Sequence, residues 1–357
     1  MTQAAEATID LSALRHNLQV VKKHAPQAKI MAVIKANAYG HGMMSVAKAL
    51  EQADAFAVAH IEEAIQLREK HKQKPIVLLH GFANESELKR ASALSLQCVI
   101  HDERQLSLLQ AFSQKINLWL KLDTGMNRLG FSPNTIMQAY GLLKEDHKVL
   151  GLFSHFANAD QVDAKSNQQQ LKLFHDTSLG PGLWRSMANS AAILTQAHSH
   201  YDWVRPGIML YGASPFSDKS AQSLGLKPVM SLSSQVIAVK DLAKGQAVGY
   251  GSRWKAKENT RIAVIGLGYG DGYPRHAADG TPVVINGESF TLAGRVSMDM
   301  ICVEIGSNAS VNVGDSAILW GQGGPAINTV AQFAETIPYE LSCRLTSRVV
   351  FKEVDNG

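Results

Sequence analysis

The chain of 357 residues is poor in cysteine. Its three cysteines, Cys98, Cys302 and Cys343, lie far apart and form no C-x-x-C pair. This spacing supports neither a disulfide framework nor a structural zinc site, so we expect all three to be buried side chains without a chemical role. Long apolar runs are also missing, because no segment approaches the roughly eighteen residues that a membrane-spanning helix needs. We therefore expect no membrane partner.

An excess of charge of one sign is missing as well. The formal net charge is +4, and the Lys and Arg residues are scattered among acidic residues, with no basic stripe and no interleaved aromatic side chains. Proteins that bind nucleic acid through its phosphates usually carry such a stripe. Nucleic acid is therefore not an expected ligand.

The amino-terminal 24 residues lack the apolar core of a secretory signal. Leu14, Leu18 and Val21 instead recur at helical spacing after Asp10 and Ser12, two residues that could cap a helix. A start of this kind is typical of a cytoplasmic protein, and we predict that location.

The first two thirds of the sequence alternate between short apolar runs and helical patterns. Segments such as 61–70 and 84–96 have apolar residues three or four positions apart. The runs between them are almost continuously apolar, as strands covered by helices on both faces are. Eight such units in about 200 residues favour a (β/α)8 barrel over an open doubly wound sheet. The eight runs are 30–34, 55–59, 75–80, 97–101, 116–122, 148–156, 183–187 and 202–204.

The pattern changes near residue 226, where β-rich alternation begins, with Gly, Asn and Asp turns between the segments. We therefore predict a barrel of residues 10–225 and a mostly β domain of residues 226–357, which residues 1–9 could join. Residues 328–337 form a helical pattern, and we expect Pro338 to stop that helix.

Polar and charged residues follow several of the predicted barrel strands. In a barrel the carboxyl ends of the strands form the functional rim, so these side chains should converge. Each of them alone could be an ordinary surface or core residue, but together they indicate one site. They are Lys35 after the first run, Lys121 and Asp123 after the fifth, His155 in the sixth, Asn189 and Ser190 after the seventh and Arg205 after the eighth.

Lys35 at such a rim favours a carbonyl cofactor. A lysine amine in an apolar, cation-rich site has a lowered pKa and becomes nucleophilic, which suits a Schiff base. Pyridoxal 5'-phosphate also needs a phosphate-binding site, which barrels commonly build from the loops after strands seven and eight. Residues 188–192 and 205–208 occupy those loops here. The residues therefore predict pyridoxal phosphate.

Two other segments do not predict a ligand. Residues 262–272 are rich in glycine, but the third glycine of a G-x-G-x-x-G motif would fall on Asp271 and no βαβ unit follows. His155 and Asp160 lie five positions apart, without the further ligands that a metal centre needs. We predict neither a dinucleotide nor a metal.

Nine motifs in both predicted domains occur in the order and approximate spacing found in one enzyme family. They are AVIKANAYGHG, LKLDTGMNRLGF, SHFANAD, ANSAA, WVRPGIMLYG, VGYGSRW, GYGDGYPR, GRVSMDM and IPYE. Nearly the whole chain thus resembles the alanine racemases, pyridoxal-phosphate enzymes with a barrel and a β domain. The resemblance implies an isomerase that interconverts L-alanine and D-alanine, in peptidoglycan precursor supply or in alanine catabolism.

The resemblance assigns two catalytic residues, Lys35 and Tyr250. Lys35 matches the lysine that carries the cofactor and serves the D-enantiomer, and Tyr250 matches the acid–base that serves the L-enantiomer. Racemisation itself asks for two groups, because the Cα proton leaves from one face and returns to the other. The family also implies a homodimer, in which the β domain of one chain covers the barrel mouth of the other, so that the active sites are shared.

Further site residues come from the same resemblance. Arg205 should face the pyridine nitrogen, with His155 orienting it, and Arg128, Met298 and Tyr269 match substrate-binding positions. Lys121 and Asp299 are supporting residues. In some relatives the lysine at the position of Lys121 is carbamylated, and the sequence does not show whether Lys121 is. The phosphate-binding positions are Tyr39, Ser190, Ile208 and Tyr339, with Asn189 and Gly207 beside them.

Three alternative functions would each account for part of the sequence. A racemase of broad specificity is the nearest, because substrate breadth depends on pocket dimensions. A basic amino-acid decarboxylase shares the architecture but needs a cysteine and acid motif that the second domain lacks. A pyridoxal-phosphate carrier would have no use for Tyr250 or for the β domain.

Overall fold

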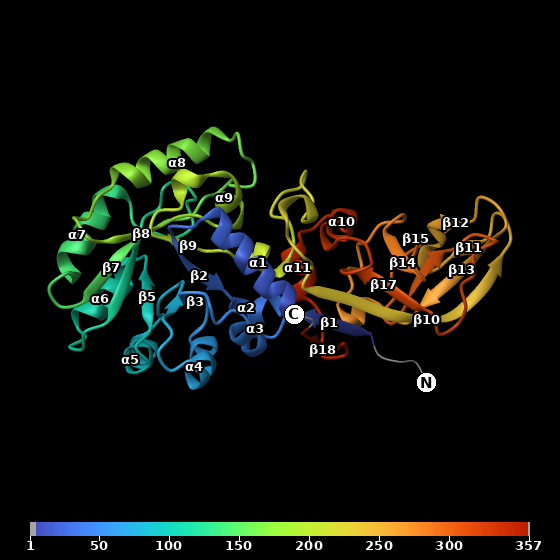
Figure 1. Cartoon of the computed structure of the whole chain (residues 1–357), viewed down its shortest axis with the longest axis horizontal. Coiled ribbons are helices and arrows are strands. Elements are labelled where there is room, and N and C mark those ends of the chain that lie inside the picture. Colours follow the sequence, from blue (N-terminus) through green and yellow to red (C-terminus); the bar gives the residue numbers. More distant parts are fainter. Residues whose placement is uncertain (1–4, 356–357) are drawn as a thin grey trace.

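The computed structural model describes residues 5–355 as two parts joined side by side (Figure 1). The larger part is a closed barrel of eight parallel strands, in which β9 returns to pair with β2. This confirms the predicted barrel, and each of the eight apolar runs supplies one strand. The strands are β2 (Lys29–Val33), β3 (Ala55–Val58), β4 (Ile76–Leu78), β5 (Gln97–Ile100), β6 (Asn117–Lys121), β7 (Lys148–Phe153), β8 (Trp184–Ser186) and β9 (Trp203–Val204).

Helices cover the outside of the barrel (Figure 1). The first begins after Asp10, whose carboxylate accepts hydrogen bonds from the backbone N–H groups of Ser12 and Ala13; Asp10, and not Ser12, is therefore its cap. Its Leu14, Leu18 and Val21 are buried, as their spacing predicts. The helices are α1 (Leu11–His24), α3 (Met43–Ala49), α4 (Ile61–Lys70), α5 (Glu85–Ala93), α6 (Glu103–Gln110), α7 (Pro133–Leu143), α8 (Lys165–Asp176) and α9 (Ser190–Thr195).

The short turn labelled α2 (Lys35–Gly40) is left-handed. Four non-glycine residues, Ala36 to Tyr39, have φ between 51° and 55°, a conformation that costs about 1–2 kcal/mol per residue. Side chains hold it: Glu63 accepts a hydrogen bond from the Ala36 N–H and the His41 ring bonds to the carbonyls of Ala38 and Tyr39. The turn places Tyr39 beside Lys35 at the mouth of the barrel.

The second part is built on an eight-stranded sheet whose order is β13-β16-β15-β14-β17-β10-β1-β18. The amino-terminal strand β1 (Glu6–Asp10) pairs with β10 and with the carboxyl-terminal strand β18, so both ends of the described chain lie in this sheet. Its other strands are β10 (Met230–Leu242), β13 (Thr260–Ile265), β14 (Pro282–Ile285), β15 (Glu288–Leu292), β16 (Ile301–Glu304), β17 (Ser316–Trp320) and β18 (Val350–Val354). A separate pair, β11 (Ala247–Val248) and β12 (Trp254–Lys255), lies at the end of the domain remote from the barrel (Figure 1).

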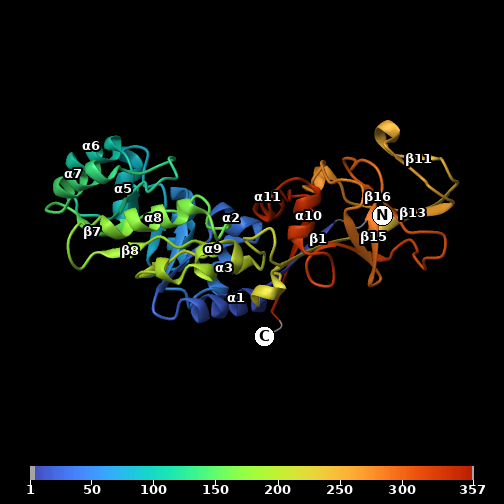
Figure 2. The same ribbon diagram turned by 90° about the horizontal axis from the view of Figure 1, so that it is seen from above.

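The expected closing helix is two helices, α10 (Ile327–Phe333) and α11 (Pro338–Cys343). Pro338 does not stop the first helix, which already ends at Phe333; it begins the second, where the missing N–H of proline needs no partner. Figure 2 shows α11 between the two parts, beside α2. No helix in residues 5–355 is both long and apolar enough to cross a membrane.

Candidate active site

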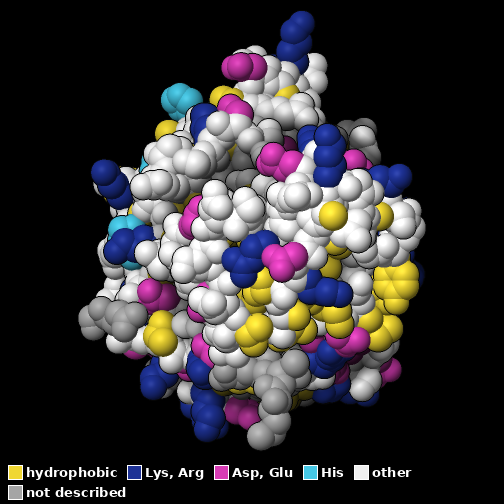
Figure 3. Space-filling view, turned by 90° about the vertical axis from the view of Figure 1, so that its right-hand side faces the viewer, with side chains coloured by type: hydrophobic (Ala, Val, Ile, Leu, Met, Phe, Trp, Pro, Cys, Tyr) yellow, Lys and Arg dark blue, Asp and Glu magenta, His cyan; other side chains and the backbone are white. Residues whose placement is uncertain are grey.

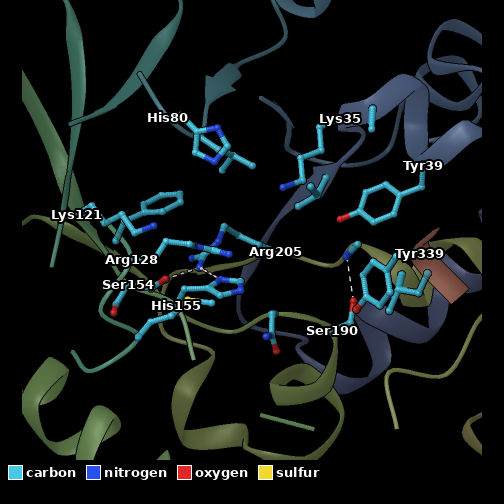
Figure 4. A pocket seen from close by; sticks show the side chains of 18 of the residues that line it. Lys35, Tyr39, His80, Lys121, Arg128, Ser154, His155, Ser190, Arg205 and Tyr339 are labelled. Atoms are coloured by element: carbon cyan, nitrogen blue, oxygen red, sulfur yellow. Dashed lines mark hydrogen bonds between the residues drawn. The ribbon is translucent and has the colours of Figure 1, made fainter. Parts of the chain in front are cut away.

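A cavity of about 420 Å³ opens at the carboxyl ends of the barrel strands. Figure 4 shows side chains from β6 and from the segments after β2, β4, β7, β8 and β9 facing it, together with Tyr339 from α11. The structure thus brings together most of the site residues predicted from the sequence. Those that line the cavity are Lys35, Tyr39, Lys121, Arg128, His155, Asn189, Ser190, Arg205, Gly207, Ile208 and Tyr339.

The cavity is strongly cationic. It is lined by Lys35, Lys121, Arg128 and Arg205, with no Asp or Glu among the described lining residues. Burial, and then the nearby Arg128, lowers the pKa of Lys35. Burial, and then Arg205 and Arg128, lowers the pKa of Lys121 to about 8. A ligand with several negative charges would therefore be favoured, and the lysine amines are more readily freed of their protons than ordinary lysines.

Arg205 is held rigidly at the floor of this cavity, with 5% of its surface exposed. Its guanidinium donates to Ser186 Oγ at 2.6 Å and to the backbone oxygens of Ser154 and Met187, and it lies 4.4 Å from the ring centroid of Phe153. Burial lowers its pKa to about 9, so it keeps its charge at neutral pH.

His155 contacts this guanidinium, since its Nδ1 lies 3.3 Å from Arg205 Nη2. Burial, and then Arg205, lowers the pKa of His155 well below its usual value, so the ring is neutral and can accept the hydrogen bond. An orienting role for His155 requires this contact, and the role itself stays a prediction.

The opposite side of the cavity resembles a phosphate-binding site. Ser190 Oγ accepts hydrogen bonds from the backbone N–H groups of Gly207, at 3.0 Å, and Met209, at 3.4 Å. A Cβ atom at Gly207 would lie 2.7 Å from Tyr39 Oη, so only glycine leaves the phenol its place. The Tyr39 hydroxyl points into the cavity, and its ring packs between Tyr211 and Tyr339 (Figure 4).

The predicted site residues of the second domain do not line this cavity. Tyr250 lies in the short helix η4 (Tyr250–Ser252), next to β11 and β12, and 72% of its surface is exposed. Tyr269 and Met298 lie together, because the Gly270 N–H donates to the Met298 carbonyl, and both side chains are exposed. Asp299 accepts a hydrogen bond from Arg348 at 2.7 Å. These four residues lie on the β domain.

The face at the end of the β domain is partly apolar. Figure 3 looks directly at it and shows hydrophobic side chains gathered over part of the surface, interspersed with basic ones. Large exposed side chains in this domain include Tyr250, Met298 and Met300. Exposed apolar groups of this size commonly mark a contact with another protein.

Among the lining residues that were not predicted from the sequence are His80, Met126 and Cys343. His80 ends the predicted strand 75–80, so a reading of every strand end would have found it. Burial, and then Lys35 and Lys121, lowers its pKa to about 4. The prediction that all cysteines are buried is wrong for Cys343, because α11 carries it to the edge of the cavity, where it is exposed. Cys98 alone is fully buried.

Comparison with known protein families gives two matches that span both parts of the chain. The model described as alanine racemase, N-terminal domain, matches residues 9–215. The model described as alanine racemase, C-terminal domain, matches residues 229–352. Among curated proteins, the alanine racemase of Nitrosococcus oceani is 48% identical over 349 residues, which cover 96% of this chain and 98% of that protein.

Solved structures agree with these matches. The biosynthetic alanine racemase of Pseudomonas aeruginosa superposes with a TM-score of 0.95 and 44% identity, covering 99% of both chains. The alanine racemase of Bartonella henselae with covalently bound pyridoxal phosphate superposes with a TM-score of 0.89 and 30% identity, covering 99% of this chain and 100% of that one.

Proposed function

The chain belongs to the alanine racemase family, and we propose that it interconverts L-alanine and D-alanine with pyridoxal phosphate as its cofactor. The observation that carries the proposal is the cationic cavity, which Lys35 lines together with Arg205 and the residues of the phosphate-binding side. Curated relatives named alanine racemase, matched over nearly their full length, support the reaction.

The residues present fit this cofactor. The Tyr39 hydroxyl and Ser190, with the glycine at position 207, offer a phosphate the polar groups and the space it needs. Lys35 would hold the cofactor covalently, a reaction that its lowered pKa favours. When bound, pyridoxal phosphate supplies an electron-withdrawing ring that acidifies the Cα–H of an attached amino acid.

Two arginines would then bind different groups, one on the substrate and one on the cofactor. Arg128 presents a planar guanidinium that can bind a substrate carboxylate through two hydrogen bonds. Arg205 would face the ring nitrogen and keep its own proton, so the nitrogen would stay largely unprotonated. A cofactor ring with an unprotonated nitrogen would withdraw electrons less strongly. This would limit side reactions and favour the return of the proton to Cα. Met298 and Tyr269, with Lys121 and Asp299 in supporting roles, would complete the substrate site.

Proton transfer would use two bases on opposite faces of Cα. Lys35 would remove the proton of D-alanine, and Tyr250 that of L-alanine. Because Tyr250 is exposed and remote from the cavity of its own chain, we propose that it acts in a homodimer, where the partner's Tyr250 faces Lys35. Each active site would then be shared.

A chiral assay tests the function. Purified protein supplied with pyridoxal phosphate and each L-amino acid in turn should racemise alanine far faster than any other substrate. Comparable rates with many amino acids would favour the broad-specificity racemase, and release of CO2 from lysine or ornithine would favour a decarboxylase. Cofactor binding without any turnover would indicate a carrier and would overturn the proposal.

We further propose a biosynthetic role, the supply of D-alanine for peptidoglycan, because the Pseudomonas aeruginosa relative is named as biosynthetic. Loss of the gene should then create a requirement for D-alanine in the medium. Growth that needs no D-alanine, but fails on alanine as the carbon source, would indicate catabolism instead. The cytoplasmic location stays a prediction.

A further inference from the structure

A second cavity, of about 590 Å³, lies between the barrel and the β domain. Its walls come from α1, His41, the segment 208–230, the loop 321–326, the start of α10 and α11. Ile208 lines both this cavity and the candidate active site, so the two are neighbours that share part of a wall. None of the cationic side chains of the active site lines the second cavity.

His41 is a buried polar side chain among the several polar residues that line this cavity. Only 3% of its surface is exposed, and it lines the cavity. Its Nδ1 lies 2.9 Å from the Tyr39 carbonyl and 3.1 Å from the Ala38 carbonyl. Because carbonyl oxygens only accept, Nδ1 must carry the proton.

The other ring nitrogen, Nε2, is therefore an acceptor. It makes no hydrogen bond within residues 5–355, and the ring itself packs against Tyr211, with centroids 4.6 Å apart. Burial lowers the pKa of His41 to about 4, which keeps the ring neutral at physiological pH. Nε2 is not among the fully buried unpaired polar atoms of the described chain, so it is open to the cavity and can accept a hydrogen bond from a donor that enters it.

The other lining residues restrict the charge that the donor molecule can carry. No Asp or Glu lies among the described residues of this cavity, so a cation finds no counter-charge. Lys227 and His16 are the other basic residues of the lining, but the lone pair of Nε2 repels an anion beside that nitrogen, so the group that meets Nε2 should be neutral. Apolar residues of the wall include Ala213, Leu226, Pro228, Met230, Ile327 and Pro338.

We propose that this interdomain cavity binds a small neutral molecule with an apolar body and one N–H or O–H group, which donates to His41 Nε2. The volume lies within the range of roughly 300–1,000 Å³ that small-molecule sites occupy. The proposal concerns a site apart from the alanine-binding one and stands whether or not the proposed function is correct.

Indole and benzofuran test the donor, because they share one shape and only indole carries an N–H. Both are titrated calorimetrically into the full chain loaded with pyridoxal phosphate, and the complex is crystallised with indole. We expect indole to bind with a dissociation constant on the order of 0.1–1 mM and benzofuran about fivefold to tenfold more weakly. Density for indole should lie between Ile327 and His41.

Two variants locate the site. Ala221→Phe puts a ring into the cavity from its wall and should abolish indole binding while cofactor binding persists. His41→Asn keeps an N–H near the two carbonyls but has no acceptor at Nε2, so it should make indole and benzofuran equal. Equal affinities in the unchanged protein would overturn the proposal. So would full indole binding by Ala221→Phe, or no binding of indole up to its solubility limit.

Discussion

The barrel and the β domain present their candidate site residues in opposite ways. Arg205 in the barrel is 5% exposed and makes several hydrogen bonds, whereas Tyr250 in the β domain is 72% exposed. The barrel cavity is formed by one chain and already holds fixed, charged groups. The β domain offers side chains that nothing in the described chain covers. The contrast supports the proposal that one chain forms the binding site and a second chain completes it.

Symmetry explains how such a division can work. In a two-fold dimer each chain gives the same surface and receives the same surface, so a β domain that covers a neighbouring barrel is covered in return. Tyr250 lies in the segment between β11 and β12, and these strands lie at the end of the domain remote from the barrel (Figure 1). Apolar side chains whose exposure would be unfavourable in a monomer would then be buried in the dimer interface.

The largest effect is expected in the barrel. Lys35→Ala removes both the group that would hold the cofactor and one of the two bases, so racemisation should fall by at least about 10⁴-fold. Activity is measured with a chiral assay. Lys29→Ala, at the other end of the same strand, is the matched control and should keep its activity. A Lys35→Ala protein with even a tenth of normal activity would contradict the assignment.

The next effect concerns the exposed tyrosine. Tyr250→Phe keeps the ring but removes the phenolic proton, so racemisation should fall about 10²–10⁴-fold with cofactor binding intact. Solvent deuterium should still enter D-alanine faster than L-alanine, because Lys35 remains. Tyr140→Phe on α7 is the control. Equal exchange into both enantiomers would mean that Lys35 reaches both faces alone.

Mixing the two inactive variants tests the shared site directly. A hybrid of a Lys35→Ala chain and a Tyr250→Phe chain contains one site with both residues, so after subunit exchange about a quarter of normal activity should return. A mixture of Lys35→Ala with Lys35→Met should stay inactive. If proven exchange restores nothing, each chain must form its own site, and the contrast between the two domains would lose its explanation.

A smaller effect is expected at the phosphate-binding side. Gly207→Ala would place a Cβ 2.7 Å from Tyr39 Oη, and the buried tyrosine has little room to move. Affinity for pyridoxal phosphate, measured by fluorescence titration, should fall about tenfold, as the loss of a charge-assisted hydrogen bond would cause. Gly141→Ala in α7, where the new methyl meets nothing within 4 Å, should leave the affinity unchanged.

Local sequence signals were enough to find the barrel and most of its rim. Even the weak runs 183–187 and 202–204 form strands, of three and two residues, because pairing with longer neighbours stabilises short strands. The rim residues followed from a topological rule, namely that strand ends meet at one mouth. His80 was missed only because that rule was not applied to its strand.

Other features depend on contacts that no local pattern encodes. The left-handed turn from Ala36 to Tyr39 contains no glycine, and Glu63 and His41, from outside those four residues, hold it. The start of α11 at Pro338 depends on where the preceding chain turns. In the proposed dimer, the position of Tyr250 relative to Lys35 depends on a second chain, so only the family resemblance could pair them.

The smallest effect is a pH-dependent change in stability. Lys121 has a pKa near 8 in the folded chain, mainly through burial, against 10.5 for an ordinary lysine. Below pH 8 its charge is present in both states, and the folded state carries the full desolvation penalty. Between pH 8 and 10.5 the unfolded state holds more protons, so the stability of the unaltered chain rises with pH in this window. Lys121→Met removes the penalty.

We expect Lys121→Met to raise the melting temperature of the cofactor-free protein at pH 7 by roughly 1–2 °C, the shift that about 1 kcal/mol produces at this size. The gain should shrink as the pH rises from 8 towards 10.5. Carbonate-free buffer keeps the amine unmodified, and Lys48→Met on the exposed side of α3 is the control and should show no such trend. An equal destabilisation by Lys121→Met at every pH would contradict this expectation. It would mean that burying the charge of Lys121 at the barrel mouth does not lower the stability of the folded chain.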